Sequence, residues 1–338
     1  MSSCNRPPAL ALTFSVLTSP LLHKNLKASC TLMDSQDKVV VVILGVGSIG
    51  RGIANTLRGD KRIELRLYDP ITAKEEFHSP KDASSGANVV IVCVVNEEQV
   101  ETALLDRDHG AVAADSKPNV IMCCSTVSPK FALRMGQVLA KKNVLYIDAP
   151  VNGGPVGAAN GTLTVMASGP EEAFEEAKIP LGLMAGKVVK VGSEWGKGST
   201  LKCVNQCLSG THIVAAAEAL LLAHKSGLDL QKVYDAIGSS GGASFMFNDR
   251  GPRIIEAIES QDEAEVKSAV HIFIKDLKIV QEQAKQCNVE TKLSKAALSL
   301  FEHGQDKLAL GKADDSSVVR VYQDQSAMDV NDGPHQDK

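Results

Sequence analysis

The stretch V-V-V-V-I-L-G-V-G-S-I-G-R-G-I-A-N-T-L, residues 39–57, decides the fold of this chain. It begins with six apolar, mostly β-branched residues, as expected of a strand buried on both faces of a parallel sheet. Glycines in the spacing G-x-G-x-x-G follow, and the pattern then becomes helical, with Ile49, Ile53 and Leu57 on one face. This order predicts the first strand–turn–helix unit of a Rossmann-type, doubly wound parallel sheet.

The glycine turn itself predicts a binding site for the pyrophosphate of a dinucleotide. Gly45 permits the tight turn, Gly47 lets the backbone approach the phosphates, and Gly50 allows the helix to pack close to the strand. The helix that begins at Ser48 and Ile49 presents free N–H groups and the positive end of its dipole. We therefore expect these five residues to bind the cofactor.

An acid follows the second predicted strand, Ile63 to Leu67, about twenty residues beyond the last glycine. At that spacing Asp69 is expected to accept hydrogen bonds from the adenosine ribose and to repel a 2′-phosphate, which favours NAD over NADP. The alternative is that Asp69 is only a turn residue before Pro70.

The composition excludes several classes of partner. The 338 residues suffice for two domains, and 22% charged and 44% hydrophobic residues are typical of a globular protein. A net charge of −4 and only 4% aromatic residues argue against nucleic acid and against an anionic membrane. The expected partner is a small-molecule substrate.

The eight cysteines form no C-x-x-C pair, so neither a metal site nor a disulfide framework is expected. Cys93, Cys123 and Cys124 lie in apolar runs and are interpreted as buried residues, and Cys203 and Cys207 as residues of a core or groove. This usage indicates a reducing compartment.

The first 33 residues contain basic residues, Ser and Thr, and no acid before Asp34. Such a segment resembles a mitochondrial or plastid transit peptide. A secretory signal remains an alternative, as does a disordered extension with Met33 as a second start and a cytoplasmic location. In each case residues 1–37 are expected to stand apart from the folded chain.

Strands and helices are expected to alternate after Asp69. Apolar strands are predicted at 88–95, 120–124 and 145–148, and Ser128-Pro129 is a helix start with a capping hydroxyl. Because ligands of parallel sheets bind at the carboxyl ends of the strands, the segments after Val95, Cys124 and Asp148 are expected to meet at one cleft. Further strands are predicted at 163–167 and 187–191.

The loop Asn152-Gly153-Gly154 follows one of these strand ends. Successive small residues expose backbone N–H groups that can hold a carboxylate. A simple tight turn is the alternative interpretation.

The sequence becomes almost entirely helical after about residue 200. A helix over 201–225 is apolar nearly all round, so it is expected in a helical core or a dimer interface, its apolar run being too short to span a membrane. Further helices are predicted at 230–237, 253–259, 264–287 and 292–302. The domains expected are an NAD-binding Rossmann domain at 38–199, an all-α substrate and dimerisation domain at 200–322 in a homo-oligomer (dimer or tetramer), and a disordered tail at 323–338.

A lysine near the start of the long helix is the candidate catalytic group. Lys202, Asn205 and Gln206 occupy positions i, i+3 and i+4, so they share a face. Asn205 is expected to be catalytic together with Lys202, either by orienting the lysine or by holding a substrate hydroxyl. With Lys202 in the first helical turn, the helix dipole and partial burial are both expected to lower its pKa toward the range of a general acid or base. The alternative is a lysine whose stem packs on a buried helix.

Several motifs together resemble the β-hydroxyacid dehydrogenase family, which includes 3-hydroxyisobutyrate and tartronate-semialdehyde dehydrogenases. They are D-A-P-V-N-G-G at 148–154, G-x-G-x-x-x-K-x-x-N at 196–205 and K-D-L at 275–277. The segments C-V-V-N at 93–96, T-V-M-A-S-G at 164–169, S-F-M-F-N-D-R at 244–250 and D-D-S-S at 314–317 most resemble the L-threonate-oxidising members.

The resemblance implies an NAD-dependent oxidation of the C2 hydroxyl of a four-carbon sugar acid, L-threonate to 2-dehydro-L-erythronate, with Lys202 as general acid/base. A 3-hydroxyisobutyrate or tartronate-semialdehyde type of activity is one alternative, and a non-catalytic cofactor-binding protein is another. The implied substrate contacts are Asn152, Gly153, Gly154, Asn205 and Gln206, and the implied cofactor contacts are Val94, Val95, Gln99, Thr126 and Lys275. Asn152 replaces the family's usual serine, and Gln206 stands where many members have asparagine, so both are expected to alter specificity.

Overall fold

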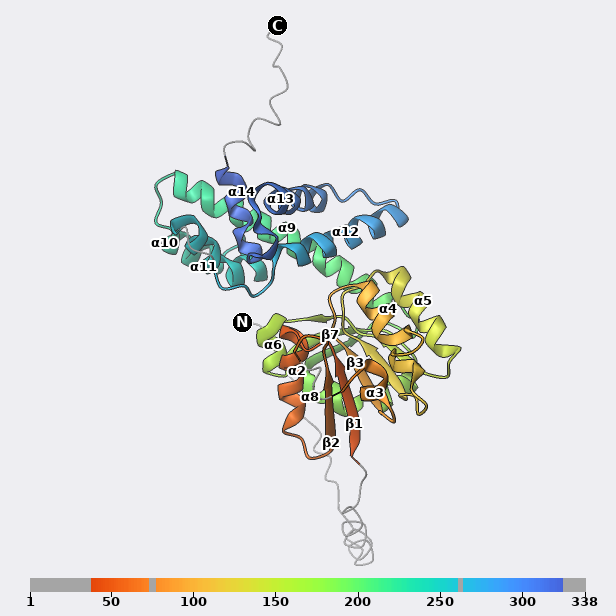
Figure 1. The fold of residues 1–338 in the computed structure, drawn as a ribbon. Helices are drawn as coiled ribbons and strands as arrows, with labels where there is room; N and C mark the ends of the chain where they lie inside the picture. The colour runs from red at the N-terminus through yellow and green to blue at the C-terminus, as the bar shows by residue number, and fades with distance from the viewer. Residues whose placement is uncertain (1–37, 73–76, 261–263, 325–338) are drawn as a thin grey trace, which may run out of the picture. The chain divides into compact units, whose positions relative to one another are not determined.

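The structure is a computed structural model that describes residues 38–72, 77–260 and 264–324. A five-stranded parallel sheet forms its first part (Figure 1). The strand order is β2-β1-β3-β4-β5, and each neighbouring pair is parallel. The predicted Rossmann-type sheet is therefore confirmed. Its strands are β1 (Val39–Leu44), β2 (Ile63–Tyr68), β3 (Val89–Val92), β4 (Val120–Cys123) and β5 (Leu145–Asp148).

Two separate apolar clusters cover the two faces of this sheet. Along β1, Val41 and Ile43 join one cluster, whereas Val42 and Leu44 join the other, because successive side chains of a strand point to opposite faces. The first cluster includes side chains of α2 (Ser48–Arg58), α6 (Gly154–Ala159), α7 (Glu171–Glu176) and α8 (Lys178–Met184). The second includes α3 (Pro80–Ser84), α4 (Glu97–Leu105), the short helix η1 (Ala111–Ala113) and α5 (Pro129–Ala140).

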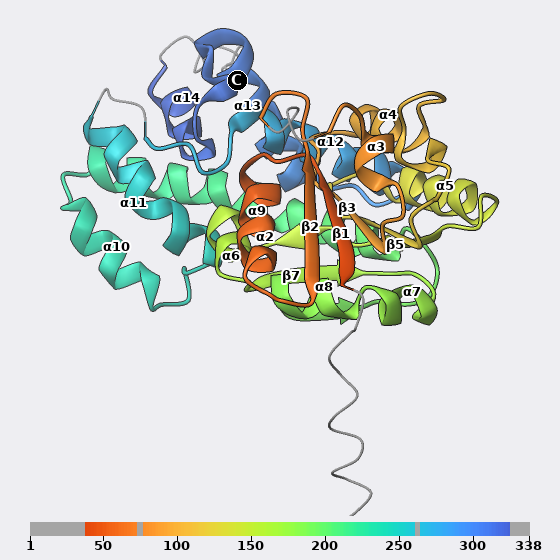
Figure 2. The same ribbon diagram turned by 60° about the horizontal axis from the view of Figure 1, so that its bottom comes forward.

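The strands after Asp148 form a second sheet rather than extending the first. β6 (Val151–Asn152), β7 (Leu163–Ala167) and β8 (Ala185–Lys190) lie in that order, with β6 antiparallel to β7. In the view of Figure 2, β7 runs across the direction of β1 and β2. Only Ala149 and Pro150 separate β5 from β6, too few residues for the crossover that a parallel neighbour needs. The expected alternation is therefore interrupted between β5 and β6 and resumes at α6, and the strands predicted at 163–167 and 187–191 are present as β7 and β8.

The C-terminal helices pack around α9 (Lys197–Lys225) and share a third apolar cluster with it. Their all-α character is confirmed, but their ends differ from the prediction. α9 begins four residues earlier than expected, α11 begins eight residues earlier, and α12 begins six residues later. The bounds are α10 (Leu230–Gly238), α11 (Phe245–Glu259), α12 (Val270–Gln286), α13 (Lys292–Leu308), η2 (Leu310–Lys312), η3 (Asp315–Val318) and α14 (Val319–Gln323).

Helix α11 begins before Pro252, a residue that normally ends a helix. Ser244 caps its start by accepting a hydrogen bond from Phe247 N. Pro252 has no N–H for the carbonyl of Asn248 four residues earlier, and the Tyr234 hydroxyl donates to that carbonyl instead, at 2.7 Å. The tertiary contact replaces the missing helical hydrogen bond, which is why the prediction began this helix too late.

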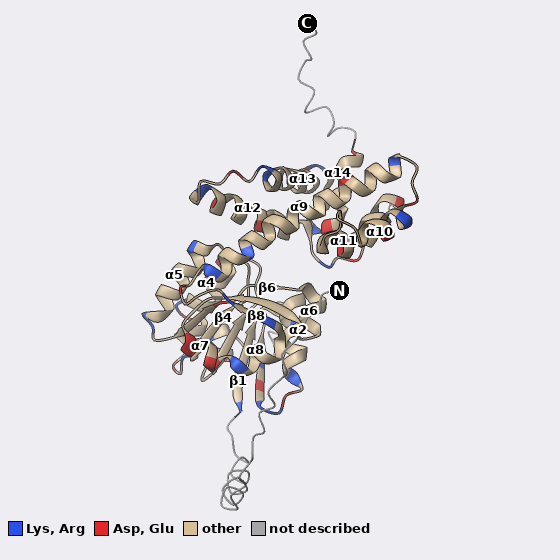
Figure 3. Cartoon of the chain, turned by 180° about the vertical axis from the view of Figure 1, so that it is seen from behind, with Lys and Arg blue, Asp and Glu red and all other residues tan. Residues whose placement is uncertain are grey.

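The long helix α9 carries few charged residues (Figure 3). By length and composition the whole helix is apolar enough to cross a membrane, with a mean hydropathy of 1.3 over 18 residues, although its uninterrupted apolar run is shorter. Half of the apolar segment is buried inside the protein, as in the core helix of a globular domain. The predicted extension at 1–37 and the tail beyond Asp324 lie outside the described residues, and the domain limits 38–199 and 200–322 stay predictions.

Candidate active site

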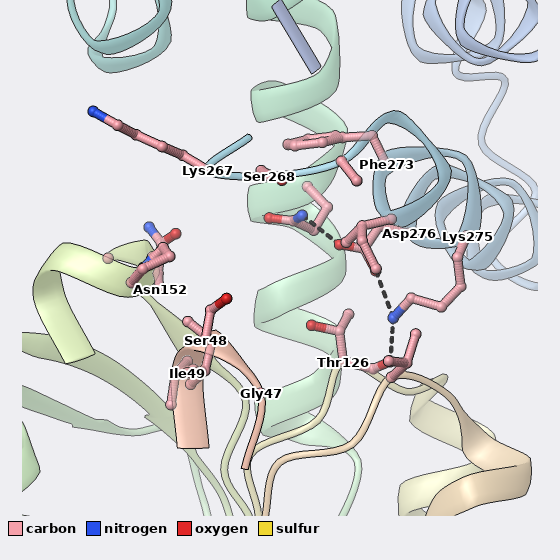
Figure 4. A pocket seen from close by; sticks show the side chains of 18 of the residues that line it. Gly47, Ser48, Ile49, Thr126, Asn152, Lys267, Ser268, Phe273, Lys275 and Asp276 are labelled. Carbon is pink, nitrogen blue, oxygen red and sulfur yellow. Dashed lines mark hydrogen bonds and ion pairs between the residues drawn. The ribbon is translucent and has the colours of Figure 1, made fainter. Parts of the chain in front are cut away.

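A cavity of about 480 Å³ lies between the carboxyl ends of the parallel strands and the helices α9, α11 and α12 (Figure 4). The sheet side provides the glycine turn after β1 and the loops after β3, β4 and β6. Most of the predicted site residues line it together: Gly47, Ser48, Ile49, Val94, Val95, Thr126, Asn152, Gly153, Gly154, Lys202, Gln206 and Lys275. Five others do not: Gly45, Gly50, Asp69, Gln99 and Asn205.

The glycine turn has the geometry that a pyrophosphate requires. Gly45 adopts a φ of +93°, which favours glycine, and its N–H donates to Tyr68 O at 2.9 Å. Gly47 precedes α2 with no side chain capping the helix, and a Cβ there would meet no atom within 4 Å. At Gly50, in contrast, a Cβ would overlap the carbonyl oxygen of Gly45. The free N–H groups at the start of α2 therefore face open space, and the residues present fit a dinucleotide phosphate.

Asp69 holds the turn after β2 and lies outside the cavity lining. Its Oδ2 accepts the Val46 N–H at 2.9 Å, and its Oδ1 accepts the N–H groups of Ile71 and Thr72 at 2.9 and 3.0 Å. Burial raises the pKa of Asp69, but these backbone bonds outweigh it and hold the pKa below its ordinary value. The carboxylate is therefore ionised beside the glycine turn. Asp69 also stabilises the turn at Pro70, as its alternative interpretation predicted.

The loop after β3 is held by side chains of the loop after β4 and of α4. Val94 N–H donates to Ser125 Oγ, and Val95 N–H donates to Gln99 Oε1, both at 2.9 Å. Gln99 thus positions Val95. Thr126 lines the cavity, and its carbonyl accepts a hydrogen bond from Lys275 Nζ at 2.9 Å.

Asp148, at the end of β5, fixes the start of α9 against the sheet. Its fully buried carboxylate accepts hydrogen bonds from Gly196 N at 3.0 Å, Ser199 N at 2.8 Å, Ser199 Oγ at 2.6 Å and Ser168 Oγ at 3.2 Å. Burial raises the pKa of Asp148, and the hydrogen bonds oppose that shift. The sequence interpretation gave this acid no role. No local signal links this acid to the start of a helix 48 residues later, because the glycines that follow Asp148 open α6 instead.

Lys202 lies in the second turn of α9, not in the first, because the helix begins at Lys197. The expected contribution of the helix dipole is therefore weak, since it falls off within the first turn. Only 6% of the Lys202 surface is exposed, and burial lowers its pKa to about 8, with Asp276 opposing the shift and Lys275 adding to it. A lysine with that pKa is half neutral near pH 8, as acid–base chemistry requires.

Gln206 bonds to an acid of α12 rather than standing free for a ligand. Its Nε2 donates to Asp276 Oδ2 at 2.6 Å, and Lys275 Nζ forms an ion pair with Asp276 Oδ1 at 2.9 Å (Figure 4). Asn205 Nδ2 donates to Gln206 Oε1 and to Ser209 Oγ, at 2.9 and 3.3 Å. Among the described residues Asn205 makes no hydrogen bond to Lys202, so the expected orientation of the lysine by Asn205 is absent here.

Two motifs far apart in the sequence meet on the helical wall. Arg250 forms a bidentate ion pair with Asp315, at 3.0 and 2.8 Å, and also pairs with Asp249 at 2.6 Å. Arg253 Nε pairs with Asp314 Oδ1 at 3.0 Å. Asp314 and Asp315 are fully buried. The segments 244–250 and 314–317 were recognised by similarity alone, and their shared ion-pair network was not foreseen.

Comparisons with known proteins agree with this arrangement. A family model described as the NAD binding domain of 6-phosphogluconate dehydrogenase matches residues 40–192. Another, described as NAD-binding of NADP-dependent 3-hydroxyisobutyrate dehydrogenase, matches residues 196–322. The L-threonate dehydrogenase of Cupriavidus necator is 36% identical over 83% of this chain and 95% of its own length. That of Escherichia coli O6:H1 is 39% identical over 83% and 94%. The chain belongs to the 3-hydroxyisobutyrate dehydrogenase-like family of hydroxyacid dehydrogenases.

Solved members of this hydroxyacid dehydrogenase family share the fold. A 3-hydroxyisobutyrate dehydrogenase from Salmonella typhimurium has a TM-score of 0.75 and 33% identity, over 84% of this chain and all of its own. The Mycobacterium tuberculosis 3-hydroxyisobutyrate dehydrogenase with L-serine has a TM-score of 0.72 and 25% identity, over 85% of this chain and all of its own. The protein is thus an oxidoreductase with a nicotinamide cofactor that acts on a hydroxy acid, and the predicted family is confirmed.

Proposed function

We propose that this dehydrogenase oxidises the C2 hydroxyl of a four-carbon sugar acid, L-threonate, to 2-dehydro-L-erythronate. The observation that carries the proposal is the buried Lys202 in a cavity whose opposite wall is the loop Asn152–Gly154. The names of the similar C. necator and E. coli proteins support the choice of substrate.

The proposed base is neutral Lys202, which takes the proton of the C2 hydroxyl while the C2 hydrogen leaves as hydride. A bound nicotinamide dinucleotide supplies the hydride acceptor. Burial favours the neutral form of Lys202 by removing water from the ammonium. Asp276 opposes this, so its negative charge keeps the pKa near 8 rather than lower, and the lysine can also return the proton in the reverse direction.

The loop after β6 is proposed to hold the substrate carboxylate. Gly153 and Gly154 have φ values of +122° and +60°, a backbone that turns successive N–H groups toward one side. A Cβ at Gly154 would meet no atom within 4 Å, so the backbone borders open space. The Asn152 side chain lies beside them on the same wall and adds a donor amide (Figure 4).

NAD is the proposed cofactor, rather than NADP. The ionised Asp69 accepts the Val46 N–H inside the glycine turn, so its negative charge lies where a ribose 2′-phosphate would be repelled. The descriptions of the matching family models name both NAD and NADP, so they do not distinguish the two cofactors. Asp69 is therefore the feature that supports NAD.

An assay of NAD reduction tests the substrate and the cofactor together. The full chain is mixed with L-threonate, its stereoisomers, glycerate, 3-hydroxyisobutyrate and tartronate, with NAD and then NADP. We expect the highest kcat/KM with L-threonate and NAD. A higher kcat/KM with 3-hydroxyisobutyrate than with L-threonate would make 3-hydroxyisobutyrate the substrate, as the name of the similar Salmonella protein states for that protein. No turnover with any hydroxy acid would point instead to a non-catalytic cofactor-binding protein, against which the buried Lys202 argues.

A further inference from the structure

Among the described residues that line the cavity, Lys267 has a side chain with no partner and no role in the proposed chemistry. Arg250 pairs with Asp315 and Asp249, and Lys275 pairs with Asp276. Lys202 is the proposed acid/base. Within the described parts of the chain the Lys267 ammonium has neither a carboxylate partner nor a hydrogen-bond acceptor, although it borders the cavity.

The backbone that carries Lys267 is held in place, in contrast to its free side chain. The N–H groups of Lys267 and Ser268 donate to Asp314 Oδ2 at 2.9 and 3.3 Å, and Asp315 N donates to Ser268 O at 2.7 Å. Asp314 is in turn fixed by Arg253 and by the Ser316 hydroxyl at 2.6 Å. A buried ion-pair network thus fixes the backbone of this loop and leaves the exposed Lys267 side chain unpaired at the cavity, where it is available to a ligand.

The location of Lys267 indicates which part of a ligand it reaches. It belongs to the helical wall, and Figure 4 shows its exposed side chain above Asn152, with the ammonium directed outward at the mouth of the cavity. A four-carbon acid with its carboxylate at the Asn152 loop and its C2 hydroxyl at Lys202 has two distal hydroxyl groups left. An ammonium offers three donors to such oxygens.

We propose that Lys267 binds the distal hydroxyl groups of the substrate and thereby selects polyhydroxy acids over hydroxy acids with an apolar end. This rests on the proposed function, because it takes the carboxylate and C2 positions from that assignment. The chemistry recognised is a hydroxyl oxygen beyond C2.

The test compares L-threonate with 2-hydroxybutyrate of the same C2 configuration, which has the same carbon chain but an apolar end. In Lys267→Met the apolar stem remains and the ammonium is lost. We expect kcat/KM for L-threonate to fall by about tenfold to a hundredfold, mainly through KM, the range of a lost hydrogen bond to a charged group. The kcat/KM for 2-hydroxybutyrate should change by less than about twofold, and the affinity for NADH should not change. Lys267→Arg, which keeps the charge, should retain most of the preference.

The matched control is Lys187→Met on β8, an exposed lysine that does not line the cavity. It should leave both substrates unaffected. An undiminished preference for L-threonate in Lys267→Met would overturn the proposal, and so would an equal loss for both substrates, which would show a structural role. If wild-type protein oxidises another hydroxy acid instead of L-threonate, the proposed function fails separately. The Lys267→Met comparison is then made with the acid that the wild type oxidises and with the analogue of that acid that lacks an oxygen beyond C2.

Discussion

The two walls of the cavity are built in different ways. The sheet wall consists of backbone groups and small residues at strand ends, such as Gly47 and Gly154, with open space before them. The helical wall carries ion pairs between side chains, such as Arg250 with the buried Asp315 and Lys275 with the buried Asp276, beside apolar residues such as Phe273. The sheet wall can be described by a short continuous motif, because a turn is a local structure. The helical wall depends on partners up to 70 residues apart, like Gln206 and Asp276.

The largest expected effect is the loss of kcat in Lys202→Met, a variant that should lose catalysis but keep cofactor binding. Loss of the general base should lower kcat by roughly 10²–10⁴-fold, with NADH affinity unchanged because the glycine turn is untouched. Steady-state kinetics and NADH fluorescence titration measure the two. Near-normal turnover in this variant would falsify the role of Lys202.

The same variant should be more stable than the wild type. The pKa of Lys202 in the folded protein, about 8, lies below its ordinary value of 10.5, so the unfolded chain binds more protons between these values. The buried lysine therefore costs roughly 3 kcal/mol at pH 7, and this cost disappears as the pH rises from 8 to 10.5. Denaturant unfolding at pH 7 and 10.5 measures it. An equal difference between the variant and the wild type at both pH values would contradict the shifted pKa.

The next effect concerns the helical wall alone. Asp314→Asn removes the nearer of the two carboxylates that pair with the buried Arg253, leaving only Asp249 at 3.3 Å, and weakens the anchor of Lys267 and Ser268. We expect the free energy of unfolding to fall by roughly 3–5 kcal/mol, as when one partner of a buried ion pair is removed. In the fraction that remains folded, KM for the hydroxy acid should rise while NADH affinity stays constant. A rise in the Kd for NADH as large as the rise in KM would show that the two walls do not act separately.

A smaller effect is the pH dependence of the reaction. Because the neutral form of Lys202 is the base, kcat/KM for oxidation should rise about tenfold per pH unit below 8 and level off above it. The reverse reduction needs the protonated form and should decline above pH 8. Initial rates from pH 6 to 10 in both directions test this. An oxidation rate that does not vary from pH 6 to 9 would assign the proton transfer to another group.

The smallest effect concerns the sheet wall. Gly47→Ala adds a Cβ that meets no protein atom, so stability should stay within about 0.5 kcal/mol, as for a surface substitution. The new methyl group stands where the phosphates approach, so the Kd for NADH should rise, by less than about tenfold. Gly50→Ala is the contrasting variant, because its Cβ would overlap the Gly45 carbonyl and should destabilise the fold itself. Unchanged NADH affinity in Gly47→Ala would show that the glycine turn does not contact the cofactor.

Particular elements show why the sequence was informative in some places and not in others. Ser128 and Pro129 marked the start of α5 correctly, because Ser128 Oγ accepts the Phe131 N–H three residues along the chain. The start of α9 was misplaced, because its cap is the carboxylate of Asp148, 48 residues before Gly196. The role expected of Asn205 was likewise drawn from spacing along one helix, whereas its amide faces Gln206 and Ser209.

The sequence alone determined the parallel sheet, the glycine turn and the presence of a lysine at the head of an apolar helix. These follow from local periodicity and from backbone requirements that act within a few residues. Only the tertiary structure decided that burial, rather than the helix dipole, lowers the pKa of Lys202, and that Asp148 positions its helix. It also decided that Lys267 is left unpaired at the cavity in the described part of the chain. Desolvation and ion pairing depend on distances between residues far apart in the chain, and only the folded structure sets those distances.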